Sequence, residues 1–158
     1  MKQFIVLACA LLLSSTVATH AQTTEPLGYG PALSLDSALE LVENARSESL
    51  ARGLRMAIAV VEPSGELVAF ARMDDVPYAS IRIAQQKART AARFRIPTSA
   101  FEDRVRSGDT KLLSSDEVIA VGGGVPIIAN GRVIGALGIS GGTAAEDTAL
   151  ATAIVGHR

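Results

Sequence analysis

The sequence predicts an α+β fold, in which helices cover an antiparallel sheet. Apolar runs of β type occur in pairs separated by tight turn signals, and strands joined this closely run antiparallel. Segments with helical spacing stand before, between and after these pairs, so helices can pack on the sheet. The chain has 158 residues, and no internal linker or repeat divides it. We therefore expect one domain with one core.

The N-terminus has the features of a secretory signal peptide, residues 1–21. Lys2 precedes an unbroken apolar run, and small residues follow as far as Ala21, the expected last residue before cleavage. We therefore expect an exported protein, periplasmic or secreted. No apolar run reaches the roughly 20 residues of a spanning helix, so no membrane span is expected. Residues 22–32 are predicted to form a flexible leader before the domain, residues 33–158.

Composition excludes several classes of function. Cleavage after Ala21 removes Cys9, the only cysteine, so the mature chain has neither a disulfide nor a cysteine metal site. His157 is then the only histidine left. The whole chain carries 15 basic and 16 acidic residues, interspersed rather than in runs. This pattern argues against a nucleic-acid partner.

The first half of the domain is predicted to be a helix followed by a pair of strands. Ser34 is a favourable N-cap for a helix over residues 35–52, and Gly53 suits the left-handed residue that ends it. The apolar positions that recur at helical spacing are Leu35, Ala38, Val42 and Ala45. Two short apolar runs, residues 56–61 and 67–71, flank a Pro-Ser-Gly turn and should pair antiparallel.

A long alanine-rich helix is predicted next, over residues 78–96. Lys87 borders its apolar face rather than its arginine face. Ser99 begins a capping box, which predicts a short helix that ends near Gly108. Residues 118–121 form a further apolar run, short enough for a strand.

The last part of the domain is rich in glycine, because eight of the fourteen glycines lie within residues 122–142. Asn130-Gly131 predicts a type I′ hairpin turn, since both central residues of that turn need positive φ. The strands on either side are residues 125–129 and 132–140. A second capping box then starts a terminal helix over residues 144–155.

Five motifs along the domain resemble the ordered motifs of the GlcG/HbpS haem-binding-like family. They are Arg72-Met73-Asp74, Lys87-Ala88-Arg89-Thr90-Ala91, Gly123-Gly124-Val125-Pro126-Ile127, Gly131-Arg132-Val133-Ile134-Gly135, and Gly138-Ile139-Ser140-Gly141-Gly142 followed by Asp147. The resemblance covers about residues 33–155. It implies a profilin-like fold with a five-stranded antiparallel sheet, frequent homo-oligomers, and haem binding in some members. It also implies kinship with a domain fused to corrinoid adenosyltransferases, although Asp75-Val76 departs from the family's usual Gly-Ala.

The resemblance implies a site for haem or another small molecule around these motifs. The expected site residues are Arg72, Met73, Asp74, Lys87, Gly123, Gly124, Pro126, Ser140, Gly141 and His157. Arg72 and Lys87 are the cations that could meet a carboxylate, and the alternative is a structural ion pair with Asp74 or Asp147. The glycine backbones could supply amide donors, since Gly142 precedes a helix N-terminus, but a purely structural turn is the alternative.

A bound haem often takes an axial donor from His, Met, Tyr or Cys. The mature chain offers His157, Met56, Met73, Tyr29 and Tyr78. His157 is chemically the best of these and is the expected metal ligand, although it lies next to the C-terminus. The resemblance thus implies haem as the cofactor, with a role in capture, storage or sensing, and it favours a binding protein over an enzyme.

Two enzyme hypotheses stand beside this one. Lys87 and Asp74 could act as base or acid on a small carboxylate of the glycolate type, because burial can tune either group. The last glycine motif also matches G-x-S-x-G, with Ser140, Asp147 and His157 in the order of a hydrolase triad. That motif lacks its usual context, because the strand of Ser140 pairs by a hairpin and the acid lies in the very next helix.

Overall fold

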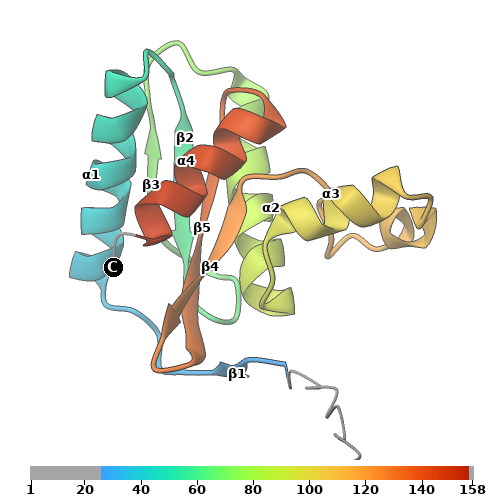
Figure 1. Ribbon diagram of the computed structural model, residues 1–158. Coiled ribbons are helices and arrows are strands. Elements are labelled where there is room, and N and C mark those ends of the chain that lie inside the picture. Colours follow the sequence, from blue (N-terminus) through green and yellow to red (C-terminus); the bar gives the residue numbers. More distant parts are fainter. Residues whose placement is uncertain (1–25, 157–158) are drawn as a thin grey trace, which may run out of the picture.

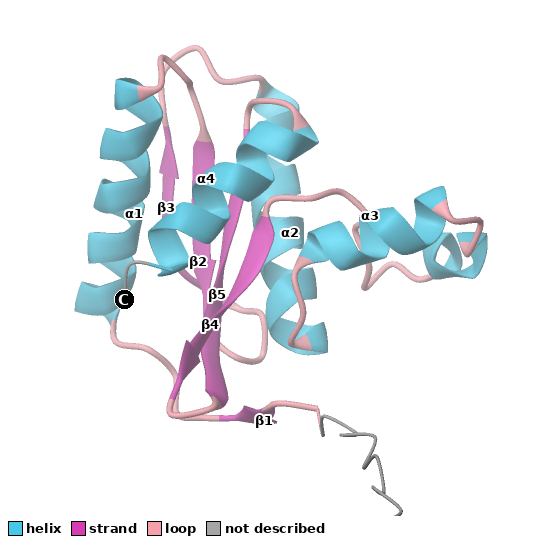
Figure 2. Ribbon diagram, in the orientation of Figure 1, coloured by secondary structure: helices cyan, strands magenta, loops and turns pink. Residues whose placement is uncertain are grey.

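The computed structural model describes residues 26–156, which form a five-stranded sheet with helices on both faces (Figure 1). The strands are β1 (Gly28–Tyr29), β2 (Ala57–Val61), β3 (Leu67–Arg72), β4 (Gly124–Ala129) and β5 (Arg132–Ser140). The helices are α1 (Leu35–Ala51), α2 (Tyr78–Phe94), α3 (Thr98–Arg106), the short 3-10 helix η1 (Thr110–Ser114) and α4 (Ala144–Gly156). α1 and α4 cover one face and α2 the other, while α3 projects from the sheet (Figure 2). The expected signal peptide and His157 lie outside the described residues.

The sheet is mixed, which corrects the antiparallel sheet expected from the sequence. β5 pairs antiparallel with β4 and β2, and β2 pairs antiparallel with β3. β1 pairs parallel with the start of β5, at Arg132 and Val133. β2 pairs with β5 only from Ala136 onward, so β2 leaves the backbone N–H and C=O groups at the start of β5 unpaired on that side. The segment before α1 forms hydrogen bonds with these groups. Residues 28 and 29, within the predicted leader, therefore form a strand.

Both predicted hairpins are present. Asn130 and Gly131 join β4 to β5 with φ of 50° and 69°, the positive values that a type I′ turn requires. β2 and β3 pair antiparallel across a tight turn. The limits of α1 also follow local signals, because Ser34 Oγ accepts a hydrogen bond from Ser37 N and Gly53 follows the helix with φ of 70°.

The two faces of the sheet are packed by side chains of different size. The core beneath α1 and α4 contains large apolar side chains, such as Leu41, Ile58, Leu137, Ile139 and Leu150. The core beneath α2 is mostly alanine. α2 lies directly on the hairpin of β4 and β5, since a Cβ on Gly138 would stand 2.1 Å from Ala84 O and one on Gly124 would stand 2.3 Å from Lys87 O. These glycines therefore serve helix packing.

Two helix predictions differ from the structure in detail. Leu35 was expected on the apolar face of α1 but is 55% exposed, because the buried face runs through Leu41 and its neighbours instead. Ser99 was expected to cap the short helix, but α3 already begins at Thr98, after the extended residue Pro97. The Thr98 hydroxyl accepts a hydrogen bond from Gly124 N at 2.8 Å, so this residue ties the start of α3 to β4.

Residues 118–121 were expected to form a strand, and this prediction is wrong. The segment bonds to a side chain of α2 instead of to a strand. Ile119 N donates to Thr90 Oγ1 at 3.1 Å, and Thr90 Oγ1 donates to Glu117 O at 3.0 Å. The apolar run is half-buried as a loop across the helix. Its composition suits either structure, and tertiary contact decides between them.

Candidate functional site

A hollow with a volume of 430 Å³ lies at the corner of the molecule where β3 ends. It is lined by residues of α1, of the segment before β2, of the end of β3 and of the segment after β3. These residues are Arg46, Leu50, Arg55, Arg72, Met73, Asp74 and Asp75. Three of the residues predicted from the sequence therefore share one hollow with two further arginines. Its volume lies within the range of about 300–1,000 Å³ that is typical of small-molecule sites.

The backbone after β3 shapes this corner. Met73 N donates to Met56 O at 3.1 Å, which holds the end of β3 against the start of β2. Asp75 then has φ of 64°, a left-handed conformation that aspartate tolerates better than most residues with a side chain. Val76 after it is buried in the alanine core beneath α2. The departure of this pair from Gly-Ala therefore fits the local structure.

Arg72 and Asp74 belong to no ion pair in the described part of the chain. Arg72 therefore does not form the structural ion pair with Asp74 or Asp147 that was the alternative to a role in ligand binding. Its guanidinium lies 5.8 Å from the centre of the Tyr78 ring, a cation–π contact. Tyr78 is 80% exposed and Arg72 is exposed as well. Arg72 therefore keeps N–H donors for a ligand.

The other two arginines of the hollow are partly engaged. Arg46 pairs with Glu43, one helical turn earlier, at 2.6 Å. Their side-chain hydrogen bond lowers the pKa of Glu43 and raises the pKa of Arg46. Arg55 Nη1 donates to Leu54 O at 3.1 Å. Because a guanidinium has five N–H donors, each arginine retains others for a ligand.

Met73 lines the hollow, but its sulfur is not free. The residue is 8% exposed, and its Sδ accepts a hydrogen bond from Met56 N at 3.3 Å. Met56 is fully buried beside it. Both methionines belong to the core beneath α1. Neither thioether can reach a bound metal without rearrangement of this core.

Lys87 lies inside the protein, away from this hollow. Its side chain is 1% exposed, and Nζ donates to Asp147 Oδ2 at 2.7 Å and to Ile139 O at 3.1 Å. Asp147 Oδ1 also accepts a hydrogen bond from Gly142 N at 3.0 Å. The ammonium thus connects α2, the end of β5 and the start of α4. Lys87 therefore forms a structural ion pair with Asp147, which was the alternative to a role in ligand binding. Lys87 and Arg72 cannot contact the same ligand, because Lys87 is buried and does not line the hollow.

The glycine motifs surround this ion pair. A Cβ on Gly123 would stand 2.9 Å from Lys87 Nζ and 2.7 Å from Asp147 Cβ, so only glycine leaves room for the pair. Gly124 N is used by the Thr98 hydroxyl. The predicted site residues that are buried here are Gly123, Gly124, Pro126 and Ser140. Their backbone faces the protein interior rather than an open surface.

Gly141 differs from the other glycine-motif residues because it adjoins the arginine-lined hollow. A Cβ on Gly141 would stand 2.2 Å from the carbonyl oxygen of Arg55, which lines that hollow. Ser140 pairs with Ala57, and Ala57 pairs on its other side with Arg72. The ends of β5 and β3 thus lie at the same end of the sheet, two strands apart.

Three residues that line the hollow were not predicted from the sequence, namely Arg46, Leu50 and Arg55. These residues come from α1 and from the segment after it, and they reach the hollow because α1 packs along β2 and β3. Arg46 and Leu50 are one helical turn apart, which places them on one side of α1. The spacing of four residues between Arg46 and Leu50 can be read from the sequence. It does not show that this side of α1 lies beside the end of β3.

Between residues 26 and 156, no three side chains of His, Cys, Asp or Glu gather in a group that could hold a metal ion. In the same range, no helix has both the length and the apolar character required to cross a membrane.

Comparison with known proteins finds relatives that span most of this domain. Residues 33–156 match the family described as haem degrading protein HbpS-like. Protein GlcG of Escherichia coli (strain K12) is 36% identical over 108 residues, which are 68% of this chain and 81% of GlcG. The crystal structure of a PduOC:haem complex has a TM-score of 0.73 at 27% identity and covers 80% of this chain and 95% of that one. The crystal structure of HbpS has a TM-score of 0.75 at 26% identity and covers 83% and 93%. This chain belongs to the HbpS-like family, as its five ordered motifs predicted.

Proposed function

We propose that this protein binds haem, or a related tetrapyrrole, at the hollow lined by Arg46, Arg55 and Arg72. The observation that carries the proposal is the presence of three guanidinium groups beside the apolar side chain of Leu50. Haem has an apolar ring and two carboxylates, and arginine binds carboxylates with two parallel hydrogen bonds. A family relative at 27% identity has been crystallised with haem, which supports the choice of ligand.

The residues of the hollow fit the acidic edge of a haem. Arg55 and Arg72 would hold the propionates, since both line the hollow and have free N–H donors. Asp74 and Asp75 line the same hollow and would repel a carboxylate, so they would direct the propionates toward the arginines. Bound haem would supply redox and ligand-binding chemistry at its iron, while the chain supplies charge and orientation.

We propose that the axial donor is one of two of the five candidates, Tyr78 or His157. Both methionine sulfurs are buried in the core. The Tyr29 hydroxyl donates to a backbone carbonyl at the end of α2 at 2.6 Å. Tyr78 adjoins Arg72 and is exposed, so its phenol oxygen is the donor that we propose. His157 is the second candidate and lies outside the described residues.

Haemin titration followed by the Soret band tests the proposal. We expect saturable binding near one haem per chain. The double variant Arg55→Gln/Arg72→Gln should bind haemin about tenfold more weakly, because it removes two charge-assisted hydrogen bonds to carboxylates. Arg132→Gln, which changes an exposed arginine at the start of β5, is the matched control and should bind normally. Equal behaviour of the two variants, or the absence of a saturable Soret shift, contradicts the proposal.

The same titration separates the two axial candidates. Tyr78→Phe should shift the Soret maximum of the bound form, because a phenol donor is lost while the ring remains beside Arg72. His157→Ala should leave that maximum in place. The reverse pattern assigns the iron to His157 and removes Tyr78 from the site.

We further propose an exported role in capture, storage or sensing of haem. The support is the N-terminal pattern of a lysine, an apolar run and small residues ending at Ala21. The profilin-like classification remains a prediction as well.

The enzyme alternatives receive no comparable support. Lys87 would need to reach a substrate to act as an acid or base, yet its side chain is 1% exposed and its ammonium is bonded to Asp147. A hydrolase triad would require the carboxylate of Asp147, but this carboxylate is bonded to Lys87. Ser140, the nucleophile of such a triad, is only 5% exposed. A binding role therefore accounts best for the accessible groups.

A further inference from the structure

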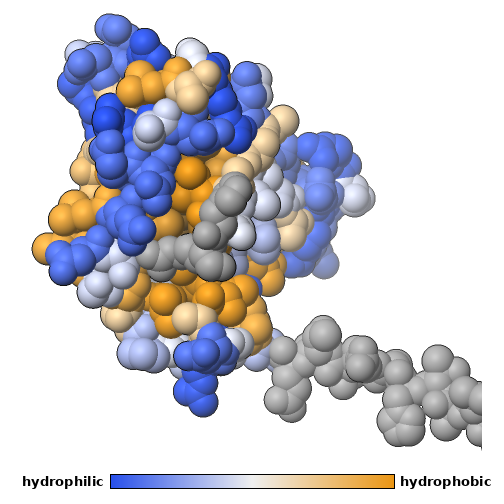
Figure 3. All heavy atoms as spheres, turned by 60° about the vertical axis from the view of Figure 1, so that its left-hand side comes forward, coloured by the Kyte–Doolittle hydropathy of each residue, from blue (hydrophilic) through white to orange (hydrophobic). Residues whose placement is uncertain are grey.

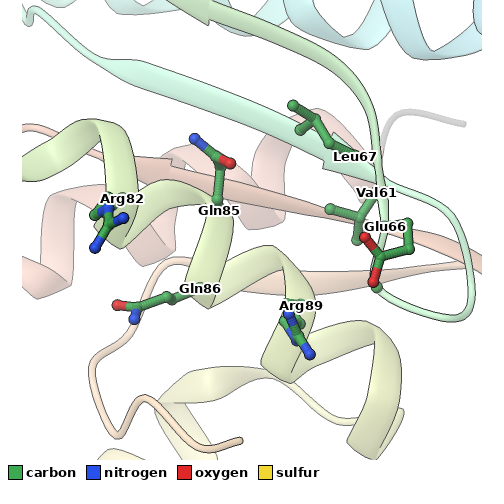
Figure 4. Close-up of a pocket in the computed structure, with 8 residues that line it drawn as sticks. Val61, Glu66, Leu67, Arg82, Gln85, Gln86 and Arg89 are labelled. Carbon is green, nitrogen blue, oxygen red and sulfur yellow. The ribbon is translucent and has the colours of Figure 1, made fainter. Parts of the chain in front are cut away.

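A second hollow, with a volume of 260 Å³, lies between α2 and the hairpin of β2 and β3 (Figure 4). Its lining includes Arg82, Gln86 and Arg89 from α2, Val61 and Leu67 from the strands, and Glu66 from the turn that joins the two strands. We propose that this hollow binds a small monocarboxylate with a short apolar body. None of these residues lines the hollow at Arg72, so the proposal is independent of haem binding.

The wall formed by α2 supplies the positive charge. Arg82 is exposed and takes part in no ion pair within residues 26–156. Gln86 and Arg89 follow one and two helical turns later, so three groups with N–H donors lie along one side of the helix. Arg89 Nη2 lies 3.5 Å from Glu117 Oε1, whereas Arg93 Nη1 lies 2.6 Å from Glu117 Oε2, so the contact of Arg89 is the longer of the two. Two arginines with spare donors and a carboxamide are groups that suit a carboxylate ligand.

The opposite wall of the hollow favours a ligand with a short apolar body and without a second carboxylate. Val61 is buried and Leu67 is 49% exposed, so together they can cover a short apolar body. Glu66 stands between the strands and α2 with its nearest cation, Arg93, at 3.5 Å. A second carboxylate on the ligand would meet repulsion from Glu66. The volume of 260 Å³ is also below the roughly 300 Å³ at which drug-sized sites begin, which favours a ligand much smaller than haem.

The walls of this hollow are held in place before any ligand binds. Gly65, in the turn between β2 and β3, has φ of 90°, and a Cβ there would stand 2.9 Å from Arg89 Cγ and 2.9 Å from Arg93 Nε. The missing Cβ allows the turn to approach α2 closely. Arg93 Nε then donates to Ser64 O at 2.6 Å, which fastens the turn to the helix. A preformed site loses less conformational entropy when it binds.

An NMR titration of the isotope-labelled protein with isovalerate tests this site. Isovalerate has one carboxylate on a short branched apolar chain. We expect saturable shifts of the side-chain signals of Arg82 and Gln86. Arg82→Gln should weaken binding about tenfold, because it replaces a charged donor pair by a neutral amide, and Arg132→Gln should not change it. Isoamyl alcohol, which lacks the carboxylate, and succinate, which has two, should each bind at least about tenfold more weakly.

Several results would overturn the proposal. They are an absence of saturable shifts in the millimolar range, equal effects of Arg82→Gln and Arg132→Gln, or shifts centred on Arg72. The two proposals can also fail separately. Arg55→Gln/Arg72→Gln should leave isovalerate binding intact, and Arg82→Gln should leave haemin binding intact.

Discussion

Lys87 and Asp147 are buried charges that stabilise the protein only as a pair. Their side chains are 1% and 3% exposed, and transfer of either charge out of water has a high free-energy cost unless its partner is present. Gly123 belongs to the same arrangement, because a Cβ there would collide with the pair. The lysine motif and the first glycine motif of the family are thus connected in this chain by one structural contact.

Single and double substitutions of this pair should show strong coupling. Lys87→Met and Asp147→Leu should each lower the free energy of unfolding by about 3 kcal/mol, because each leaves one buried charge without a partner. The double variant should lose less than the sum of the two, since no unpaired charge remains. Urea unfolding of the four proteins measures this. A double variant whose loss equals the sum would show that the two charges are not coupled.

At the scale of elements, the start of α4 carries a complete capping box. Thr143 N donates to Glu146 Oε2 at 2.8 Å, and Glu146 N donates to Thr143 Oγ1 at 3.3 Å. The backbone hydrogen bond from Thr143, and then its hydroxyl, lower the pKa of Glu146. This local pattern was read correctly from the sequence, because all of its partners lie within one turn of the chain.

The lowered pKa makes the stabilisation of α4 depend on pH. The folded pKa of Glu146 lies below its unfolded value, so its contribution is fully present above the unfolded pKa of about 4.3 and is lost as pH falls through the folded pKa. Glu146→Ala should therefore be less stable than the natural protein at neutral pH, and the difference should shrink in acid. Urea unfolding as a function of pH measures this. Thr143→Ala removes the hydroxyl but keeps the backbone donor, which is the larger cause of the lowered pKa, so it should remove only part of the pH-dependent difference. A difference that is constant with pH would contradict the assignment.

At the scale of the whole molecule, the helix α1 presents an apolar surface to solvent. Leu35 and Leu39 lie one turn apart and are 55% and 50% exposed. Figure 3 shows apolar side chains gathered among charged ones on the side of the molecule that α1 forms. An exposed apolar cluster of this kind often marks an interface. We therefore propose that the protein is a homo-oligomer, as the family resemblance implied.

Light scattering after gel filtration tests this proposal. We expect the natural protein to have a mass of more than one chain. Leu35→Glu/Leu39→Glu should reduce that mass, because charge in an apolar interface is unfavourable. Leu113→Glu, at an exposed leucine of η1, is the matched control and should not reduce the mass. A monomeric natural protein, or equal loss in both variants, would remove α1 as the interface.

The parts of this fold that the sequence predicted depend on neighbours along the chain. The turn at Asn130-Gly131 and the capping of α1 and α4 are satisfied by residues a few positions away. The parallel pairing of β1 could not be predicted in this way, because its partner on β5 is more than a hundred residues away and no turn connects them. The apolar run at residues 118–121 likewise forms a hydrogen bond with a residue distant in the sequence, the side chain of Thr90.

The candidate site, like the fold, has some features that the sequence predicts and others that depend on tertiary contacts. The sequence by itself determined the family, the hairpin turn at Asn130-Gly131 and Arg72 as a candidate cation for a ligand. Only the tertiary structure decided that Lys87 is buried against Asp147, while Arg46 and Arg55 join Arg72 at one hollow. The physical reason is that backbone conformation follows from local sterics and hydrogen bonds. Burial and convergence of side chains depend instead on which distant elements pack together.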